Sequence, residues 1–247
     1  MLAQPADGHT LVLGSYSTHV IAPLASKQNA EMTKAALDGF TALGVFGHAP
    51  LLLAVNAASP HRTFAQFIES AKTRRTTYGT FGTGSSAHLL GEIVAANTQA
   101  QLQHVPYKGS APATTDLLGQ HVDSVILTVA ALQPLVTKGE LRALAVSSKA
   151  RMPSLPQVPT FDESDQQGLA ETGWFAVFVP AKAPADAMQR LATTLVKVLA
   201  EAEVKAKLVE LGLEPVSAKE AIDAQAMWRR SVDSAKALLS RTKVELD

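Results

Sequence analysis

The sequence TYGTFGTGSSAHLLGEIVAAN, residues 77–97, places glycines and serines directly before an apolar helical pattern. Backbone amides at the start of a helix have no intrahelical partner and carry about half a positive charge. The amides and hydroxyls of Gly84, Ser85 and Ser86 are therefore suited to binding a carboxylate or a phosphate. A second interpretation stays open, in which Ser85 or Ser86 only caps the helix and the glycines form a tight turn.

Known phosphate and nucleophile motifs do not fit this loop. Its glycine order is G-x-x-G-x-G, whereas the dinucleotide fingerprint is G-x-G-x-x-G, and Lys108 stands where an acidic residue is expected. No lysine follows Gly84 as a P-loop requires, and the G-x-S-x-G motif of lipases is absent. The loop therefore favours a general anion site over a nucleotide site or a hydrolase nucleophile.

A second polar loop follows the next predicted strand, LQHVPY, and contains Lys108, Gly109 and Ser110. Thr128 comes directly after a third strand, DSVIL. Ligands of parallel α/β sheets bind at the carboxyl ends of the strands, so we expect both loops and Thr128 to face one crevice. Two helix starts with a lysine between them predict a small-anion site, although Lys108 taken alone also fits an ordinary solvated lysine.

The chain has seven histidines but no H-x-x-x-H or HExxH spacing, so we do not expect a metal site. His88 lies one turn inside the helix after Gly84, where it either contacts the ligand or is a structural histidine. Ser85 and His88 form a conceivable nucleophile pair, but the sequence places no acidic residue to orient the imidazole. We therefore expect no catalysis.

The composition excludes several classes of partner. The 247 residues carry 22 basic and 22 acidic side chains, so no net charge attracts nucleic acid or an anionic membrane. No window of about eighteen uninterrupted apolar residues spans a bilayer. Cysteine is absent, which excludes disulfides and thiolate metal sites.

The elements that must position these residues indicate an α/β protein. Strands and helices alternate from Thr77 to Ser148, which predicts a parallel sheet covered by helices on both faces. The segments predicted before this region are a strand at 10–13, two extended pieces within 43–56, and a helix from about 64, capped by Thr63 and Gln66. The segments predicted after it are a proline-rich linker or surface loop, a strand at 174–180 and three helices. In the last helix, Ser217 and Glu220 form a capping box, and Ile222, Val232 and Leu239 face inward.

Five blocks of the chain resemble the Bug, or TctC-like, solute-binding proteins that serve tripartite tricarboxylate transporters. The blocks are, in order, ADGHTLVLGSYSTHVIAP, TYGTFGTGSSAHLLGE, HVPYKGSAPATTDLLGQHVD, GELRALAVSSKARMPSLPQVPTFDE and WFAVFVPAKAP. The match is collinear from about Pro5 to the C-terminus, and HVPYKGSAPATTDLLG is highly specific.

The resemblance implies a periplasmic α/β protein with a two-lobed, type II periplasmic-binding-protein fold, each lobe a sheet flanked by helices. Such a protein captures a small di- or tricarboxylate, or a related organic acid, in the cleft between its lobes and delivers it to the membrane subunits of the transporter. It is a monomer, has no enzymatic activity and uses no cofactor. Residues 1–56 and 172–247 are then expected to form lobe 1, and residues 57–171 lobe 2.

The resemblance also implies that backbone amides, hydroxyls and ordered water hold the ligand. The residues expected in lobe 1 are Ser15, Ser17, Thr18 and His19. The residues expected in lobe 2 are Thr83, Gly84, Ser85, Ser86, His88, Lys108, Gly109, Ser110 and Ala111, to which the sheet-edge argument adds Thr128.

The chain departs from the family's pattern at its front. Family members normally begin with a signal peptide, a strand, a glycine-rich carboxylate loop, a helix and a second strand, whereas Met1 lies just before the ADGHT block. We therefore expect lobe 1 to be incomplete, with unpaired strand edges and an exposed apolar groove. We also expect weak binding by this chain and tight binding by a version extended upstream. The resemblance predicts a periplasmic location, and a start at Met1 without a signal peptide predicts a cytoplasmic one.

Two other function classes stay open. An NADP-dependent α/β enzyme would place Lys108 near the 2′-phosphate, although the glycine order argues against it. A ligand-dependent sensory or interaction protein would use the same site and dock onto a receptor.

Overall fold

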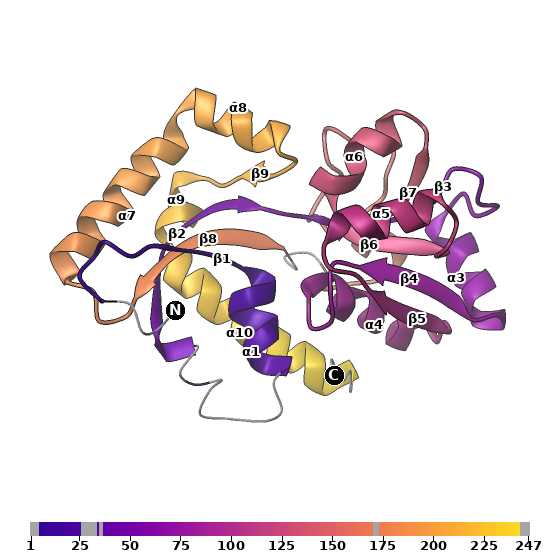
Figure 1. The fold of residues 1–247 in the computed structure, drawn as a ribbon, viewed down its shortest axis with the longest axis horizontal. Coiled ribbons are helices and arrows are strands. Elements are labelled where there is room, and N and C mark those ends of the chain that lie inside the picture. The colour runs from indigo at the N-terminus through magenta and orange to yellow at the C-terminus, as the bar shows by residue number, and fades with distance from the viewer. Residues whose placement is uncertain (1–4, 26–33, 35–36, 170–172, 243–247) are drawn as a thin grey trace. The chain divides into compact units, whose positions relative to one another are not determined.

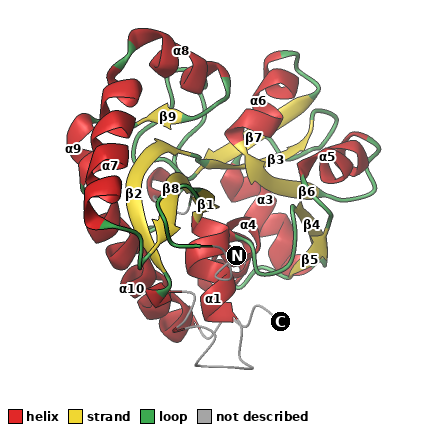
Figure 2. Cartoon of the chain, turned by 60° about the vertical axis from the view of Figure 1, so that its left-hand side comes forward, coloured by secondary structure: helices red, strands yellow, loops and turns green. Residues whose placement is uncertain are grey.

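The computed structural model describes residues 5–25, 34, 37–169 and 173–242. The chain divides into two compact units, which are described one at a time (Figure 1). Unit 1 comprises Met1–His48 and Gly173–Leu238, and unit 2 comprises Ala49–Thr172 and Leu239–Asp247. Each unit contains one sheet with helices packed against it, as Figure 2 shows in yellow and red, so the predicted α/β fold class is confirmed.

Unit 1 contains a four-stranded antiparallel sheet in the order β1-β8-β2-β9. Its strands are β1 (Val12–Ser15), β8 (Trp174–Pro180), β2 (Phe40–His48) and β9 (Glu214–Pro215). Alternation along β8 puts Trp174, Ala176 and Phe178 on one face, and all three are buried. Trp228 packs against Phe178 with 5.0 Å between the ring centroids, so this face forms the core of the unit.

The last predicted helix of the chain is divided in two in the structure. The helices of unit 1 include the π-helix η1 (Ser17–Ile21), α1 (Ala22–Ala25), α7 (Ala185–Ala200), α8 (Ala202–Glu210), α9 (Ala218–Ile222) and α10 (Ala224–Thr242). The last residues of α10, from Leu239 on, belong to unit 2. The capping box of Ser217 and Glu220 is confirmed at the start of α9. Because α9 ends at Ile222 and α10 begins anew after Asp223, the two helices do not share one apolar face. Ile222 is 66% exposed, so its predicted inward position is wrong, whereas Val232 is buried as predicted.

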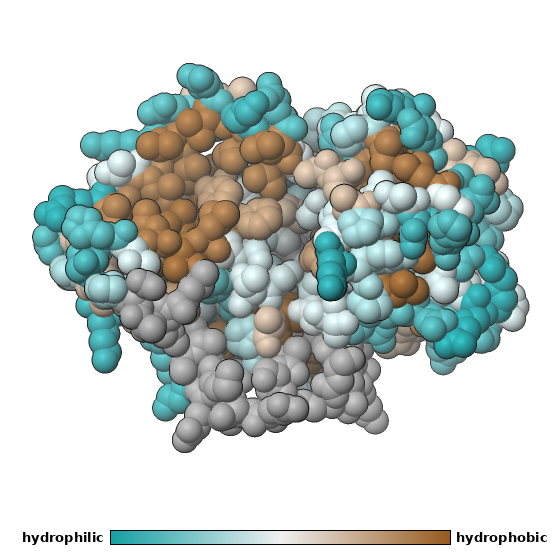
Figure 3. Space-filling model, viewed as in Figure 1, coloured by the Kyte–Doolittle hydropathy of each residue, from teal (hydrophilic) through white to brown (hydrophobic). Residues whose placement is uncertain are grey.

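Unit 1 exposes several large apolar side chains. The apolar side chains that are most exposed are Leu11, Leu13, Val198, Val209, Leu211 and Ile222. Helix α7 is amphipathic, yet among its residues only Leu199 is buried. Figure 3 shows this surface in brown over the part of unit 1 that carries α7, α8 and β2. In the described part of the chain, nothing covers it.

Unit 2 contains a five-stranded mixed sheet in the order β5-β4-β6-β3-β7. Its strands are β5 (Leu102–Pro106), β4 (Thr76–Thr80), β6 (Ser124–Thr128), β3 (Leu51–Asn56) and β7 (Leu141–Val146). Strand β4 is parallel to both β5 and β6, as predicted. Strand β3, which lies outside the region predicted to be parallel, is antiparallel to both β6 and β7 and makes the sheet mixed.

Strand β3 also corrects the predicted boundary between the lobes. The sequence assigned residues up to 56 to lobe 1, but β3 hydrogen-bonds between two strands of unit 2. Residues Leu51–Val55 are all at most 2% exposed. A continuous apolar run of this kind fits a central strand that is covered on both faces, and unit 2 supplies that position.

The helices of unit 2 follow the predicted alternation with the strands. They are α3 (Phe64–Thr73), α4 (Ser86–Thr98), α5 (Ser110–Leu118) and α6 (Val129–Thr137), with the short 3₁₀ helix η2 (Asp162–Ser164) near the end of the unit. The predicted capping box of α3 is confirmed in part: Thr63 Oγ1 accepts the amide of Gln66 at 3.2 Å, whereas Gln66 Oε1 accepts the amide of Arg62, not that of Thr63, at 2.7 Å. The proline-rich segment is more than a surface loop, since Met152, Leu155 and Val158 join the core of unit 2. None of the described helices is both long and apolar enough to span a membrane.

Candidate functional site

Three parallel strands of unit 2 end at one edge of the sheet. Thr80 at the end of β4 is paired with Pro106 at the end of β5, and β6 runs parallel to β4 on its other side. The amide of Tyr107 donates to the carbonyl of Thr80 at 3.1 Å. This hydrogen bond holds the loop after β4 beside the loop after β5. The glycine–serine loop before α4 and the lysine loop before α5 are therefore neighbours, as the sequence predicted.

The start of α4 is capped by the protein's own side chains. Ser85 Oγ accepts the amide of His88 at 3.2 Å and donates to the carbonyl of Gly82 at 2.6 Å. The amide of Gly84, whose φ of +67° favours glycine, donates to Nδ1 of His88 at 3.2 Å. The capping interpretation is thus confirmed for Ser85. These groups already have protein partners, while Thr83 is exposed at the tip of the loop.

The start of α5 is not capped by a side chain. Its N-cap residue is Gly109, with φ 105° and ψ 177°, a backbone conformation that is essentially restricted to glycine. The amides of Ser110 and Ala111 lie in the first turn, where helix geometry provides no backbone partner. Lys108 is exposed, and no carboxylate of the described residues lies within ion-pair distance of it. This helix start therefore has the donors and the charge for an anion.

Two further residues border this edge. Thr128 ends β6 and is the N-cap of α6; it is half-buried, and its hydroxyl makes no capping bond. Tyr107 donates its hydroxyl to Asp116 Oδ2 of α5 at 2.6 Å, and burial together with this carboxylate raises the pKa of Tyr107 to about 12. The Asp116 carboxylate is therefore bound to Tyr107 and does not cap the first turn of α5.

The site residues expected in lobe 1 form a compact turn in unit 1. The amide of Ser15 donates to Thr18 Oγ1 at 3.0 Å, and the amide of Thr18 donates back to Ser15 Oγ at 3.2 Å. His19 is 9% exposed, and its ring is stacked on Phe178 with 4.1 Å between centroids. Burial lowers the pKa of His19. Ser17 is half-buried in η1, beside this turn.

A buried polar network beneath the glycine loop was not predicted. The rings of His88 and His104 are stacked with 3.8 Å between centroids and an interplanar angle of 15°. His104 Nε2 lies 2.7 Å from Thr80 Oγ1, and the hydroxyl of Tyr78 donates to Glu92 Oε1 at 2.6 Å. Burial is the main cause that lowers the pKa of His88, and burial with His88 beside it lowers the pKa of His104 to about 4.

Two sequence signals point to this network. Tyr78 and Thr80 alternate onto one face of β4, and Tyr78 is the register partner of His104 in β5. His88 and Glu92 stand four residues apart, which places them on one face of α4. The stacking of the two imidazoles depends on the register of β4 with β5 and on the angle at which α4 crosses these strands. Residue spacing alone therefore does not predict this stacking.

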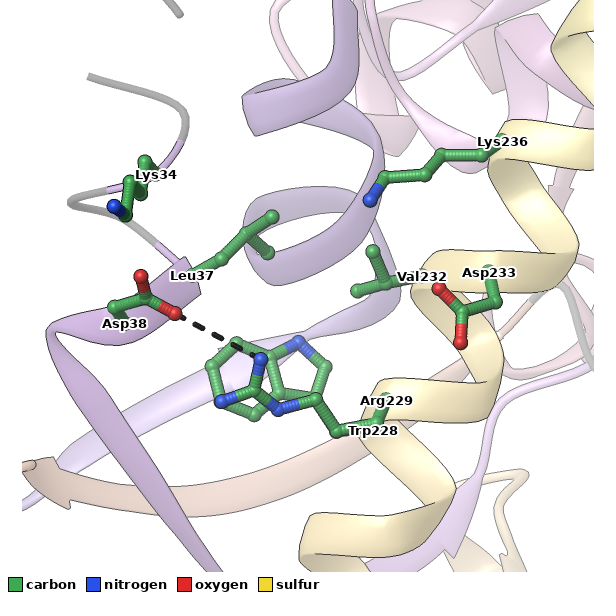
Figure 4. A pocket seen from close by; sticks show the side chains of 8 residues that line it. All are labelled: Lys34, Leu37, Asp38, Trp228, Arg229, Val232, Asp233 and Lys236. Atoms are coloured by element: carbon green, nitrogen blue, oxygen red, sulfur yellow. Dashed lines mark ion pairs between the residues drawn. The ribbon is translucent and has the colours of Figure 1, made fainter. Parts of the chain in front are cut away.

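A separate cavity lies in unit 1 and contains none of the predicted site residues. It has a volume of about 310 Å³ and is shown in Figure 4. Its lining residues are Lys34, Leu37, Asp38, Trp228, Arg229, Val232, Asp233 and Lys236. Asp38 Oδ1 and Arg229 Nη1 lie 3.7 Å apart, and the Arg229 guanidinium is 5.8 Å from the centroid of the Trp228 ring. Charges of both signs line this cavity, and among the described residues no three His, Cys, Asp or Glu side chains are grouped to hold a metal ion.

Comparison with known proteins decides the family. Residues 1–243 match the family described as the tripartite tricarboxylate transporter family receptor, TctC. The chain belongs to this family. The resemblance of the sequence to the Bug and TctC-like proteins is therefore confirmed.

Individual TctC and Bug relatives agree with this assignment. The chain is 30% identical over 213 residues to a UPF0065 protein in the tcbD-tcbE intergenic region of Pseudomonas sp. (strain P51), covering 85% of this chain and 62% of that protein. The solved structure of R. palustris Rpa4515 with adipate is 30% identical with a TM-score of 0.87, covering 99% of this chain and 81% of that one. The structure of the periplasmic binding protein BugD is 25% identical with a TM-score of 0.84, again covering 99% and 81%. The chain has the fold of these periplasmic binding proteins, and it spans between 53% and 62% of the length of the first curated relatives.

Proposed function

We propose that this chain is the solute-binding part of a periplasmic receptor that captures a small carboxylate and delivers it to the membrane subunits of a tripartite tricarboxylate transporter. Family membership supports the receptor role. The uncapped start of α5, with the amides of Ser110 and Ala111 beside the free charge of Lys108, is the observation that carries the ligand class.

The expected binding free energy is consistent with weak-to-moderate affinity at the site on unit 2. A hydrogen bond to a charged group contributes about 1.5–3 kcal/mol, and micromolar affinity requires about 8 kcal/mol. Two amides, the Lys108 ammonium and the Thr83 hydroxyl together reach about 6–12 kcal/mol before the cost of association is subtracted. The lobe 1 residues Ser15 to His19 are the proposed source of further contacts.

The chemistry of the loops favours reversible binding over catalysis. The Ser85 hydroxyl donates to the Gly82 carbonyl, and His88 Nδ1 accepts from Gly84, so the pair is not arranged as a nucleophile and its base. The residues of the two loops, 81–85 and 107–111, include no acidic side chain that would recognise an amine. We therefore propose a di- or tricarboxylate without a cationic group, and adipate, which is bound in Rpa4515, is the first probe.

Calorimetry with adipate and with its uncharged diamide tests this proposal. Proline is tolerated at the first position of a helix, so Ser110→Pro removes one amide donor and leaves the helix in place. We expect Ser110→Pro to weaken adipate binding about 10- to 100-fold, while Ser110→Ala, which keeps the amide, stays near the unsubstituted protein. Lys108→Gln should weaken binding and reduce its salt dependence. Equal binding of adipate and the diamide, or unchanged binding by Ser110→Pro, would refute the proposed site.

A further inference from the structure

The histidine pair of unit 2, in which His88 is buried and His104 half-buried, is in direct contact with the glycine loop. His88 is 5% exposed in the first turn of α4, and its Nδ1 lies 3.2 Å from the amide nitrogen of Gly84. A backbone amide is always a donor, so Nδ1 must be the unprotonated nitrogen of the ring. The ring proton is then on Nε2, which lies 3.8 Å from Glu92 Oε1.

His104 fastens the same loop at a second point. Its Nε2 contacts Thr80 Oγ1 at 2.7 Å, and this hydroxyl oxygen accepts the amide of Gly82 at 3.2 Å. Gly82 has a φ of +142° and Gly84 a φ of +67°, backbone conformations that favour glycine and that give the loop its shape. The two imidazoles therefore hold the two glycines that shape the loop between β4 and α4.

From this geometry we propose that His88 is a positioning residue for carboxylate binding. This inference rests on the proposed function. His88 does not touch the ligand; it acts through the Gly84 amide, which fixes the loop carrying Thr83 beside the uncapped start of α5. Protonation of Nδ1 would put two donors face to face and would release the loop, so the neutral ring is the binding-competent form.

The surroundings of the pair determine the direction of the pH effect. The titratable groups that contact it are Tyr78 from β4 and Glu92 from α4. Glu92 favours the charged form of His88, but burial outweighs it, and the pKa of His88 is lowered. The pair therefore stays neutral at neutral pH, and binding weakens as the pH falls below the ordinary histidine value of about 6.5.

Three variants separate positioning from simple packing. In His88→Asn, the side-chain oxygen takes the place of Nδ1 and accepts the Gly84 amide without titrating. In His88→Leu, the acceptor is lost. His121→Asn is the matched control, because His121 is an exposed histidine of the same unit outside the network.

The first readout needs no ligand. Nitrogen-15 spectra report which imidazole nitrogen of His88 carries the proton, and the Gly84 amide resonance and its hydrogen exchange report the loop. We expect an unprotonated Nδ1, a protected Gly84 amide in the unsubstituted protein and in His88→Asn, and a shifted, faster-exchanging amide in His88→Leu. A protonated Nδ1 at neutral pH would overturn the inference.

The second readout is adipate affinity between about pH 7.5 and pH 5. We expect His88→Leu to weaken binding at least about 10-fold at pH 7.5, and His88→Asn to recover most of it while losing the acid-dependent part of the profile. His121→Asn should retain the full profile. An unchanged affinity in His88→Leu, or the same acid dependence in His88→Asn, contradicts the role. If adipate binds to none of the proteins but the ligand-free spectra match expectation, the proposed ligand class fails and the loop assignment stands.

Discussion

At the scale of single residues, the polar network depends on how closely Tyr78 approaches α4. The ring of Tyr78 is fully buried against Gly91, and a Cβ atom at that position would lie 2.2 Å from its Cε2 atom. This close approach lets the hydroxyl reach Glu92 one residue further along the helix, and that bond, after burial, raises the pKa of Tyr78. Gly91 is therefore required for packing, and the cause is space rather than backbone conformation.

We predict that Gly91→Ala destabilises the protein, although alanine is the better helix former. Overpacking in a core costs about 1–3 kcal/mol, which exceeds the gain of about 1 kcal/mol in helix propensity. Ala96→Gly at an exposed position of α4 is the matched control and measures the propensity difference alone. Denaturant unfolding of the three proteins checks this, and a Gly91→Ala protein more stable than the original would show that Tyr78 has room to move.

At the scale of elements, the two neighbouring helix starts differ in which groups accept hydrogen bonds from their first-turn amides. Helix α4 is capped by Ser85, and its loop is held by His88. Helix α5 has a glycine at its N-cap and no side-chain bond there. The starts of α6, α7 and α8 also lack a side-chain cap, but only at α5 does an exposed lysine, Lys108, stand directly before the N-cap residue. This difference makes α5 the main anion-binding element in our account, with α4 and its loop in support.

Two glycine substitutions separate the stability of α5 from its binding role. Gly109 (φ +105°) and Gly139 (φ +75°) both have backbone conformations that disfavour a side chain, and a Cβ atom would meet nothing within 4 Å at either position. We predict that Gly109→Ala and Gly139→Ala each cost about 1–3 kcal/mol of unfolding free energy. Only Gly109→Ala should also weaken adipate binding in calorimetry. An equal loss of adipate affinity in Gly139→Ala would mean that the weaker binding of Gly109→Ala results from its lower stability.

Much of unit 2 was predictable from its sequence, because local signals govern it. Thr63 caps helix α3 as its spacing indicates. The strand–helix alternation predicted that the glycine loop and the lysine loop are neighbours. Strand β3 was misassigned, because its apolar run shows burial on both faces but not which sheet provides it. The His88–His104 stack was missed, since it depends on register and crossing angle, which are long-range properties.

At the scale of the whole chain, the apolar residues are distributed unevenly. Unit 2 exposes Leu118 at 36%, whereas unit 1 exposes Leu13 at 69%, Ile222 at 66% and Leu211 at 54%. Single exposed leucines are ordinary on protein surfaces, but a gathered apolar surface binds other apolar groups. We therefore expect unit 1 to be the part of this chain that binds other apolar groups in solution.

We predict that a hydrophobic dye binds this chain and that Leu13→Gln with Leu211→Gln reduces the fluorescence. The unfolding free energy should stay within about 0.5 kcal/mol, because both side chains are exposed. Leu118→Gln in unit 2 is the control and should leave dye binding unchanged. Equal fluorescence from all the proteins would show that the dye binds elsewhere.

The central claim is that the uncapped start of α5 binds a carboxylate. Titrating the nitrogen-15-labelled protein with adipate while following the amide resonances tests this claim most directly. We predict saturable shifts that are largest at Ser110 and Ala111, a smaller shift at Thr83, and none with the uncharged diamide. Saturation by adipate with the Ser110 and Ala111 amides unmoved would contradict the account.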